Sequence, residues 1–184
     1  MPVIPSGRAL LDPEPLLRRA GLALDMRYAD LGAGMLGHFV LPASQIVGPA
    51  GMVYAVDILK SALASIESRT QLESITNVKT VWADLERPGG VKIPAGTLDI
   101  VSFVNVAHLL VGGSIPIQEA MRLLRSHGRV LVVDWDPSAG SLLVSSAHRV
   151  ASDEVKAKFL QQGLQLLDEF SAGPQHWGLL FRRP

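Results

Sequence analysis

The stretch that decides the fold is DLGAGMLGHF, which runs from Asp30 to Phe39. Glycines at positions 32, 34 and 37 give it the G-x-G-x-x-G spacing of a loop that holds a dinucleotide. Glycine has no Cβ, so such a loop lets the backbone approach a ligand closely. A short strand is expected over 27–31, just before the loop, and apolar residues follow the loop at helical spacing over 39–47. The stretch therefore predicts a strand, a ligand-binding loop and a helix.

Strands and helices continue to alternate along the chain. Met52–Val56 is an almost wholly apolar run, which is typical of a strand buried on both faces of a parallel sheet. The sequence predicts strands at 27–31, 52–56, 78–83, 98–105 and 130–134, with helices at 13–20, 39–47, 60–69 and 117–125. Right-handed crossovers between such strands build an open, doubly wound α/β sheet.

The last third of the chain has a different pattern. Ser152 is in position to cap a helix whose first turn carries Asp153 and Glu154, and Gly163 closes it. Segments 164–170 and 176–182 then flank the loop SAGPQ, which is short enough for a β-hairpin. The parallel sheet is therefore expected to end in an antiparallel pair.

Composition narrows the class of protein. The 184 residues suit one domain, and 17 basic side chains balance 17 acidic ones, which disfavours a dedicated nucleic-acid binder. The chain has no cysteine, so disulfides, thiolate metal sites and a catalytic thiol are excluded. Its five histidines, among them His38 and His148, are scattered, and we expect no metal site. No apolar run approaches the roughly 18 to 20 residues of a membrane span. Charges and prolines interrupt the N-terminus where a signal peptide would be apolar. We therefore expect a cytoplasmic protein.

Three expected strands end at or next to a carboxylate, namely Asp30, Asp57 and Asp84. A carboxylate after the second strand can accept from both ribose hydroxyls of NAD or of S-adenosylmethionine. Asp57 therefore does not distinguish between these two cofactors. Asp30 favours the second, because a carboxylate repels a pyrophosphate and attracts a sulfonium or an ammonium. The alternative is that Asp30 only orders the glycine loop by accepting from its backbone N–H groups.

Several quoted segments together resemble one family. YADLGAGMLGHFVLPASQIVGPAGMVYAVDILKSAL, VKTVWADLERP, GTLDIVSFVNVAHLL and EAMRLLRSHGRVLVVDW are similar, in order and spacing, to the motifs of class I S-adenosylmethionine-dependent methyltransferases. The likeness is strongest to small stand-alone bacterial members of the UbiE or type-11 kind. It implies a three-layer α/β/α Rossmann-like fold, a mostly parallel seven-stranded sheet with an antiparallel C-terminal strand, and a single domain over 1–184, with a lid over 1–24 and a core over 25–184.

The resemblance also implies a cofactor site along the ends of the first four strands. Its expected residues are Asp30, Gly32, Gly34, Asp57, Ile58, Asp84, Leu85 and Asn105. Asp30 and the two glycines would hold the methionyl part, Asp57 the ribose, Ile58 one face of the adenine and Asp84 the adenine amino group. Asn105 would lie near the transferring methyl group. The chain departs from the family's D-x-G-x-G-x-G at Leu36, which implies one inserted residue in the loop that would hold the methionine part.

The acceptor side is less well defined by the sequence. His108 is placed to act as a general base, although it could instead pack under the N-terminal segment or bond a backbone carbonyl. Asp134 and Trp135 could line the acceptor pocket, and Trp135 could equally be a hydrophobic cover. His176 and Trp177 are interpreted as structural. The sequence thus predicts methyl transfer to a small-molecule acceptor, with the short lid indicating an open pocket or one completed in a homodimer. An NAD(P)-dependent oxidoreductase and a non-catalytic S-adenosylmethionine-binding protein remain as alternatives.

Overall fold

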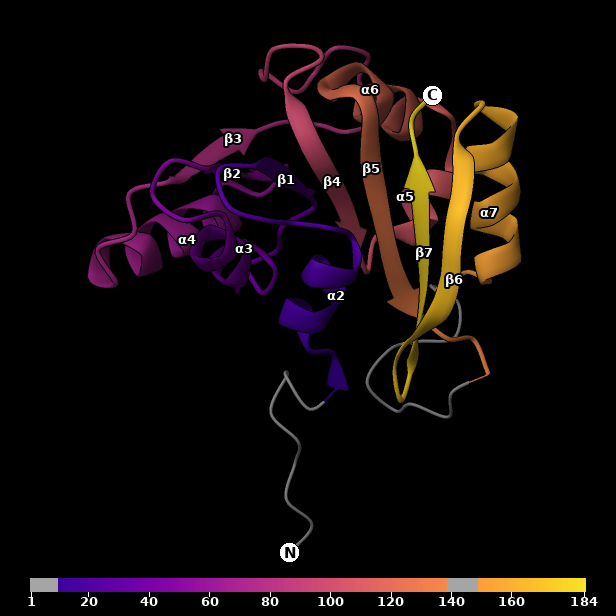
Figure 1. The fold of residues 1–184 in the computed structure, drawn as a ribbon, viewed down its shortest axis with the longest axis horizontal. Coiled ribbons are helices and arrows are strands. Elements are labelled where there is room, and N and C mark those ends of the chain that lie inside the picture. The colour runs from indigo at the N-terminus through magenta and orange to yellow at the C-terminus, as the bar shows by residue number, and fades with distance from the viewer. Residues whose placement is uncertain (1–9, 139–148) are drawn as a thin grey trace, which may run out of the picture.

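A computed structural model describes residues 10–138 and 149–184. Seven strands form one sheet in the order β3-β2-β1-β4-β5-β7-β6, with β3 at one end and β6 at the other (Figure 1). Their bounds are β1 (Arg27–Leu31), β2 (Met52–Asp57), β3 (Val78–Trp82), β4 (Leu98–Val104), β5 (Leu124–Trp135), β6 (Gln165–Gly173) and β7 (His176–Arg182). Neighbouring strands from β3 to β5 are parallel, whereas β7 runs antiparallel to both β5 and β6. The predicted antiparallel strand is confirmed.

Helices cover both faces of the sheet. They are α2 (Pro13–Arg19), α3 (Val40–Val47), α4 (Lys60–Leu72), α5 (Ala107–Gly112), α6 (Ile115–Leu123) and α7 (Ser152–Gln161). Side chains of α2, α3 and α4 share one buried cluster with alternate strand residues such as Tyr28 and Val53. Side chains of α5, α6 and α7 share the other with Ala29 and Tyr54. Because both faces of each central strand are buried, the strands read as continuous apolar runs.

Most expected elements lie within a few residues of their predicted bounds, and the differences have local causes. α5 was not expected, because its short apolar sequence AHLLVG shows no clear period. β5 begins at Leu124 instead of 130, since Leu124 pairs with Leu98 before a bulge shifts the register. The cap of α7 is also corrected: Ala151 is the N-cap, and Ser152 is the first helical residue, with a hydroxyl that donates to Glu169.

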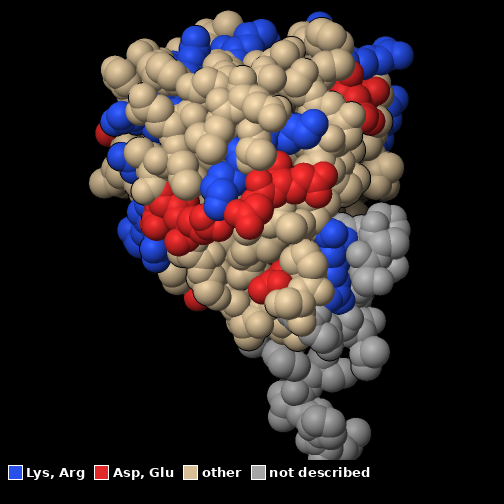
Figure 2. All heavy atoms as spheres, turned by 90° about the vertical axis from the view of Figure 1, so that its right-hand side faces the viewer, with Lys and Arg blue, Asp and Glu red and all other residues tan. Residues whose placement is uncertain are grey.

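The face formed by α7 and β6 carries charges of both signs (Figure 2). Lys156 of α7 pairs with Asp153 and with Glu169 of β6, and Arg19 of α2 pairs with Asp168. Acidic side chains form a band across the middle of this face, with basic ones beside them. This mixed face does not offer the basic patch that binds nucleic acid. In the described part of the chain, no helix combines the length and apolar character needed to cross a bilayer.

Candidate cofactor site

A cavity of about 540 Å³ lies at the carboxyl ends of β1 to β4. Ligands of open α/β sheets bind at this edge, where the strand order changes direction, here between β1 and β4. The cavity brings together all nine residues that the sequence predicts for the site, which are Asp30, Gly32, Gly34, Asp57, Ile58, Asp84, Leu85, Asn105 and His108. Loops from four strands therefore meet as the topology requires.

The two leading glycines of the loop meet different demands. Gly32 has a φ of 90°, its N–H donates to the Val56 carbonyl, and a Cβ there would stand 2.8 Å from Val106 Cγ1. Gly34 has a φ of 63°, and a Cβ there would meet nothing within 4 Å. Gly32 is thus required by packing against the segment after β4. Gly34 presents bare backbone to open space in the cavity.

The residue at which the loop departs from the family pattern, Leu36, lies at the outer edge of the loop. The side chain of Leu36 is 68% exposed, and its carbonyl accepts a hydrogen bond of 2.5 Å from Arg69 of α4. The next residue, Gly37, packs against Ile66 of the same helix, where a Cβ on the glycine would stand 3.1 Å from Ile66 Cγ1. These two contacts anchor the outer part of the loop on α4, while a Cβ at Gly34 would still meet open space.

Asp57 joins the glycine loop to the segment after β2. One carboxylate oxygen accepts from the Gly34 N–H at 2.9 Å, and the other accepts from the Leu59 N–H at 2.8 Å. The residue is buried to 8% exposure, yet it lines the cavity. Each carboxylate oxygen has a second lone pair. Asp57 is thus held in place by backbone donors and can still accept from the hydroxyls of a ligand.

Asp30 is the most buried acid of the site, at 2% exposure. It accepts a hydrogen bond of 2.6 Å from the Ser102 hydroxyl, which also contacts the Tyr28 hydroxyl at 2.5 Å. Burial raises the pKa of Asp30 to about 7; the Ser102 hydrogen bond opposes the rise, and the charge of Asp57 adds to it. Among the described hydrogen bonds, Asp30 accepts this one from Ser102 and none from the N–H groups of the glycine loop, which goes against the alternative that it only orders the loop. The Asp30 carboxyl therefore lines the cavity without serving as the acceptor for the loop N–H groups.

The far end of the carboxylate row is formed after β2 and β3. Asp84 accepts from the Glu86 N–H at 3.0 Å and lies 3.7 Å from the Arg87 guanidinium, while Leu85 is buried beside it. Ile58 is 53% exposed at the cavity, and its carbonyl accepts from the Trp82 indole at 2.8 Å. An apolar side chain and a hydrogen-bond acceptor thus face the same space, as a flat heterocycle with an amino group would require.

The segment after β4 forms the opposite end of the cavity. Asn105 has a φ of 58°, and its N–H donates to the Val133 carbonyl. His108 is exposed and lines the cavity. His38 and Phe39 line it too, although the sequence did not single them out for the site. His38 contacts the Leu11 carbonyl at 2.7 Å, so it also ties the N-terminal segment to the loop.

Two residues considered for the acceptor pocket lie outside the cavity lining, and for Trp135 the alternative of a packing role agrees with its contacts. Asp134 is buried and accepts from the N–H groups of Ala107 and Trp135, both at 2.7 Å, so it fixes the start of α5 instead of lining the cavity. Trp135 packs against His176 with ring centroids 4.1 Å apart and lies outside the cavity lining. Burial lowers the pKa of His176 to about 4, which keeps that side chain neutral and supports its structural role.

Histidines do not assemble into a metal site in the part of the chain that the structure describes. Within 10–138 and 149–184, no group of three histidine, aspartate or glutamate side chains is arranged to hold an ion. His148 lies outside the described residues.

Comparison with known proteins settles the family. A family model described as a methyltransferase domain matches residues 23–177. The chain belongs to this methyltransferase domain family. The prediction of a methyltransferase is thereby confirmed. The alternative of an oxidoreductase, which rested on the glycine spacing, is not supported. No curated protein matches the chain significantly.

Solved structures similar to this methyltransferase share its fold. A SAM-dependent methyltransferase from Aquifex aeolicus is 21% identical, with a TM-score of 0.90 over 98% of this chain and 94% of that one. A putative type 11 methyltransferase from Sulfolobus solfataricus is 23% identical, with a TM-score of 0.74 over 95% and 94%. Fibrillarin from Aeropyrum pernix, solved with natively bound S-adenosyl-L-methionine, is 19% identical, with a TM-score of 0.68 over 91% and 73%. The predicted Rossmann-like methyltransferase fold is confirmed, while the UbiE-like subtype stays a prediction.

Proposed function

We propose that the chain transfers a methyl group from S-adenosylmethionine to a small, largely apolar acceptor that carries no negative charge. The observation that carries this proposal is the row of carboxylates in one cavity, in which Asp30, Asp57 and Asp84 lie at the carboxyl ends of three successive strands. Membership of the methyltransferase domain family supports it. A pyrophosphate-containing cofactor would instead face these carboxylates without a compensating cation.

The residues of the cavity fit this cofactor. Gly34 leaves an open cradle for the methionyl part, and the buried Asp30 carboxyl faces a ligand whose sulfonium and ammonium are cationic. Asp57 is held by two backbone donors with acceptor capacity left for the ribose hydroxyls. Ile58 would pack on the adenine, and Asp84 would accept from its amino group. Leu85 and Asn105 would complete the site beside the adenine and near the methyl group.

When bound, S-adenosylmethionine supplies an already activated methyl group. The chain's own contribution is to position the acceptor in line with it, an effect that can reach about 7 to 11 kcal/mol in well-oriented systems. His108 lines the cavity three residues after Asn105. Its imidazole is in place to take the proton of a hydroxyl or amine acceptor as the new bond forms. We propose His108 as that base.

The charge of the lining points to the class of acceptor. The charged residues that line the cavity are Asp30, Asp57, Asp84 and Glu86, and no lysine or arginine lines it among residues 10–138 and 149–184. The remaining wall is mostly apolar, with Met35, Leu36, Phe39, Val106 and Leu109 in addition to two imidazoles. A carboxylate or phosphate on the acceptor would lose its hydration without gaining a cationic partner. The cavity therefore suits a neutral or cationic acceptor.

The single domain over 1–184, the lid over 1–24, a cytoplasmic location and a homodimer remain proposals. None of the described residues 10–24 lines the cavity, and the contact between the Leu11 carbonyl and His38 is the link that supports a covering role. Deleting residues 1–9 tests the lid through the acceptor KM. Light scattering of the purified protein tests the homodimer.

Calorimetric titration tests the cofactor directly. We expect micromolar binding of S-adenosylmethionine and S-adenosylhomocysteine and none of NAD. Asp57→Asn should weaken both by at least about tenfold, because a hydrogen bond to an ionised acceptor contributes about 1.5 to 3 kcal/mol. Asp168→Asn, which alters a surface ion pair on β6, is the matched control and should bind as the parent does. Binding of NAD in place of the other two would refute the proposal.

Turnover tests the acceptor class and separates an enzyme from a binding protein. Production of S-adenosylhomocysteine should be followed with pairs of hydroxyl acceptors that differ only in whether a remote group is a carboxylate or its primary alcohol. We expect kcat/KM to favour the alcohol of each pair by at least about tenfold. A preference for the carboxylates would overturn the acceptor class. Cofactor binding without turnover across a broad panel would favour the non-catalytic alternative.

A further inference from the structure

The segment between β3 and β4, residues 83–97, contains neither helix nor strand. Leu85, Val91 and Ile93 from this segment are nevertheless buried in the core. Buried backbone N–H and C=O groups need partners, and a segment outside the sheet must find them elsewhere. The partners of its central part are two side chains of α6.

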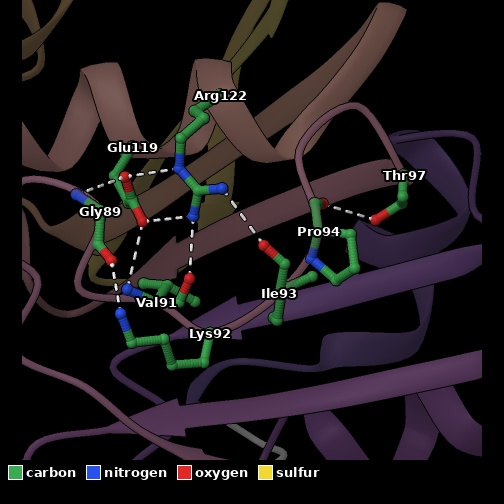
Figure 3. A network of polar contacts seen from close by, with 8 residues as sticks. All are labelled: Gly89, Val91, Lys92, Ile93, Pro94, Thr97, Glu119 and Arg122. Atoms are coloured by element: carbon green, nitrogen blue, oxygen red, sulfur yellow. Dashed lines mark hydrogen bonds and ion pairs between the residues drawn. The ribbon is translucent and has the colours of Figure 1, made fainter.

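Glu119 and Arg122 lie one helical turn apart on α6 and both reach into this segment (Figure 3). The Glu119 carboxylate accepts from the backbone N–H groups of Gly89 and Val91, at 3.2 and 3.1 Å. The Arg122 guanidinium donates to the carbonyls of Val91 and Ile93, at 2.8 and 3.2 Å. Two side chains thus satisfy four backbone groups of the loop.

The two side chains also hold each other. Arg122 donates to both carboxylate oxygens of Glu119, at 2.6 and 2.9 Å. Desolvation acts to raise the pKa of Glu119, but the hydrogen bonds from Arg122 and from the two backbone N–H groups outweigh it and keep that pKa below its ordinary value. Glu119 is 3% exposed, so the pair forms a charged clamp, Glu119 with Arg122, that is built into the interior side of the loop.

The clamped loop abuts the part of the cofactor site that follows β3. A Cβ at Gly90 would stand 2.7 Å from the Asp84 carbonyl, so the two backbones are in close contact. The N–H of Gly90 donates to the Arg87 carbonyl, and the N–H of Arg87 donates to the Asp84 carbonyl. A shift of the loop at Gly89 or Val91 is therefore passed to Asp84 through two short hydrogen-bonded steps.

We propose that Glu119 and Arg122 are positioning residues for base recognition: by clamping the loop 85–93 they hold Asp84 where it reads the amino group of the adenine. This inference rests on the proposed S-adenosylmethionine site. Neither side chain lines the cavity, so the clamp acts through Asp84 and makes no contact with the ligand. The expected signature is a loss of base selectivity, which a role in general stability does not produce.

Two ligands that differ only at the base test the proposal. S-adenosylhomocysteine carries the adenine amino group, and S-inosylhomocysteine carries an oxo group in its place. We expect the parent protein to prefer the first by about tenfold to a hundredfold, the range of one hydrogen bond to an ionised acceptor. Arg122→Lys keeps the charge beside Glu119 but lacks the planar, five-donor guanidinium with which Arg122 makes its four hydrogen bonds to Glu119, Val91 and Ile93. This variant and Arg122→Ala should bind S-adenosylhomocysteine at least about tenfold more weakly and S-inosylhomocysteine within about twofold of the parent.

Arg125→Ala is the matched control, because the exposed Arg125 side chain, just beyond α6, pairs with Asp99 and makes none of the hydrogen bonds to residues 85–93 described above. It should leave both affinities unchanged. Equal weakening of both ligands in the Arg122 variants, or no weakening of either, would overturn the proposal. If Arg122→Ala does not fold, Arg122→Lys decides alone. Equal affinity of the parent for the two ligands would overturn the inference and leave the cofactor in place, whereas binding of neither would overturn the proposed function as well.

Discussion

Replacing Asp30 by asparagine should stabilise the protein at alkaline pH and weaken its binding of S-adenosylmethionine. Asp30 is 2% exposed, and burial raises its pKa to about 7 from an ordinary value of 3.8. Asparagine is nearly isosteric, keeps an oxygen that accepts from Ser102, and carries no charge to desolvate. The same substitution removes the carboxylate that would attract the cationic parts of the cofactor.

The size and sign of the effect follow from proton linkage. Between pH 3.8 and about pH 7 the folded protein holds a proton on Asp30 that the unfolded chain has lost. Stability therefore falls as the pH rises through this window. Each unit of pKa difference corresponds to about 1.4 kcal/mol, so the whole shift costs about 4 kcal/mol, of which about 3 kcal/mol develop between pH 5 and pH 8. The asparagine variant is spared this cost.

Thermal unfolding of the parent and of Asp30→Asn should be compared at pH 5 and pH 8. One kcal/mol shifts Tm by about 2 to 4 °C in a chain of this size, so the variant's Tm advantage should grow by about 6 to 12 °C from pH 5 to pH 8. Asp168→Asn on the surface is the control and should show no such growth. A Tm difference that stays constant with pH would show that the Asp30 carboxylate is not desolvated in the folded protein, and the reasoning would fail.

Three further predictions concern the loop, the surface and the core. Gly34→Ala should cost about 1 to 2 kcal/mol of stability from the positive φ alone, because the new Cβ has open space. Gly32→Ala should cost more, since its Cβ would clash with Val106. Urea unfolding measures both losses, and equal losses would contradict the packing argument. Arg19→Ala should cost less than about 1 kcal/mol because its ion pair is exposed, and a larger loss in the same assay would count against this. Phe159→Ala should cost about 3 to 5 kcal/mol, since this ring is fully buried against two other phenylalanines, and thermal unfolding with a loss below about 2 kcal/mol would contradict that packing.

The parts of the fold that the sequence predicts well are those with strong local signals. The strand over Met52–Asp57 is apolar throughout and ends at a carboxylate, so its position and its burial on both faces can be inferred from composition alone. The helix start at Pro13 follows from Asp12, whose side chain does accept from the Glu14 N–H. In contrast, α5 lies between Asn105 and Gly113 with an apolar sequence too short to show a period.

The candidate site divides in the same way. Glycines and carboxylates at strand ends can be assigned because parallel strands bring their carboxyl ends to one edge, and no further knowledge of the packing is needed. Asp134 met the same criterion and was assigned wrongly to the acceptor pocket. Its carboxylate is occupied by the N–H of Ala107, a partner that belongs to the helix the sequence does not reveal. The error in the site therefore follows from the error in the fold.

Ser102 and Glu119 show what a linear pattern cannot contain. Ser102 lies within an apolar strand, and the sequence does not single it out for the site, but the register of β4 against β1 places it beside Asp30, where its hydroxyl donates to the carboxylate that lines the cavity. Glu119 looks like an ordinary surface residue of an amphipathic helix, yet it is buried because a loop about thirty residues earlier in the chain lacks backbone partners of its own. Both residues become functional only through a neighbour that is distant in sequence. The residues that would touch the cofactor are therefore the easiest to predict in this chain, and those that hold them in place are the hardest.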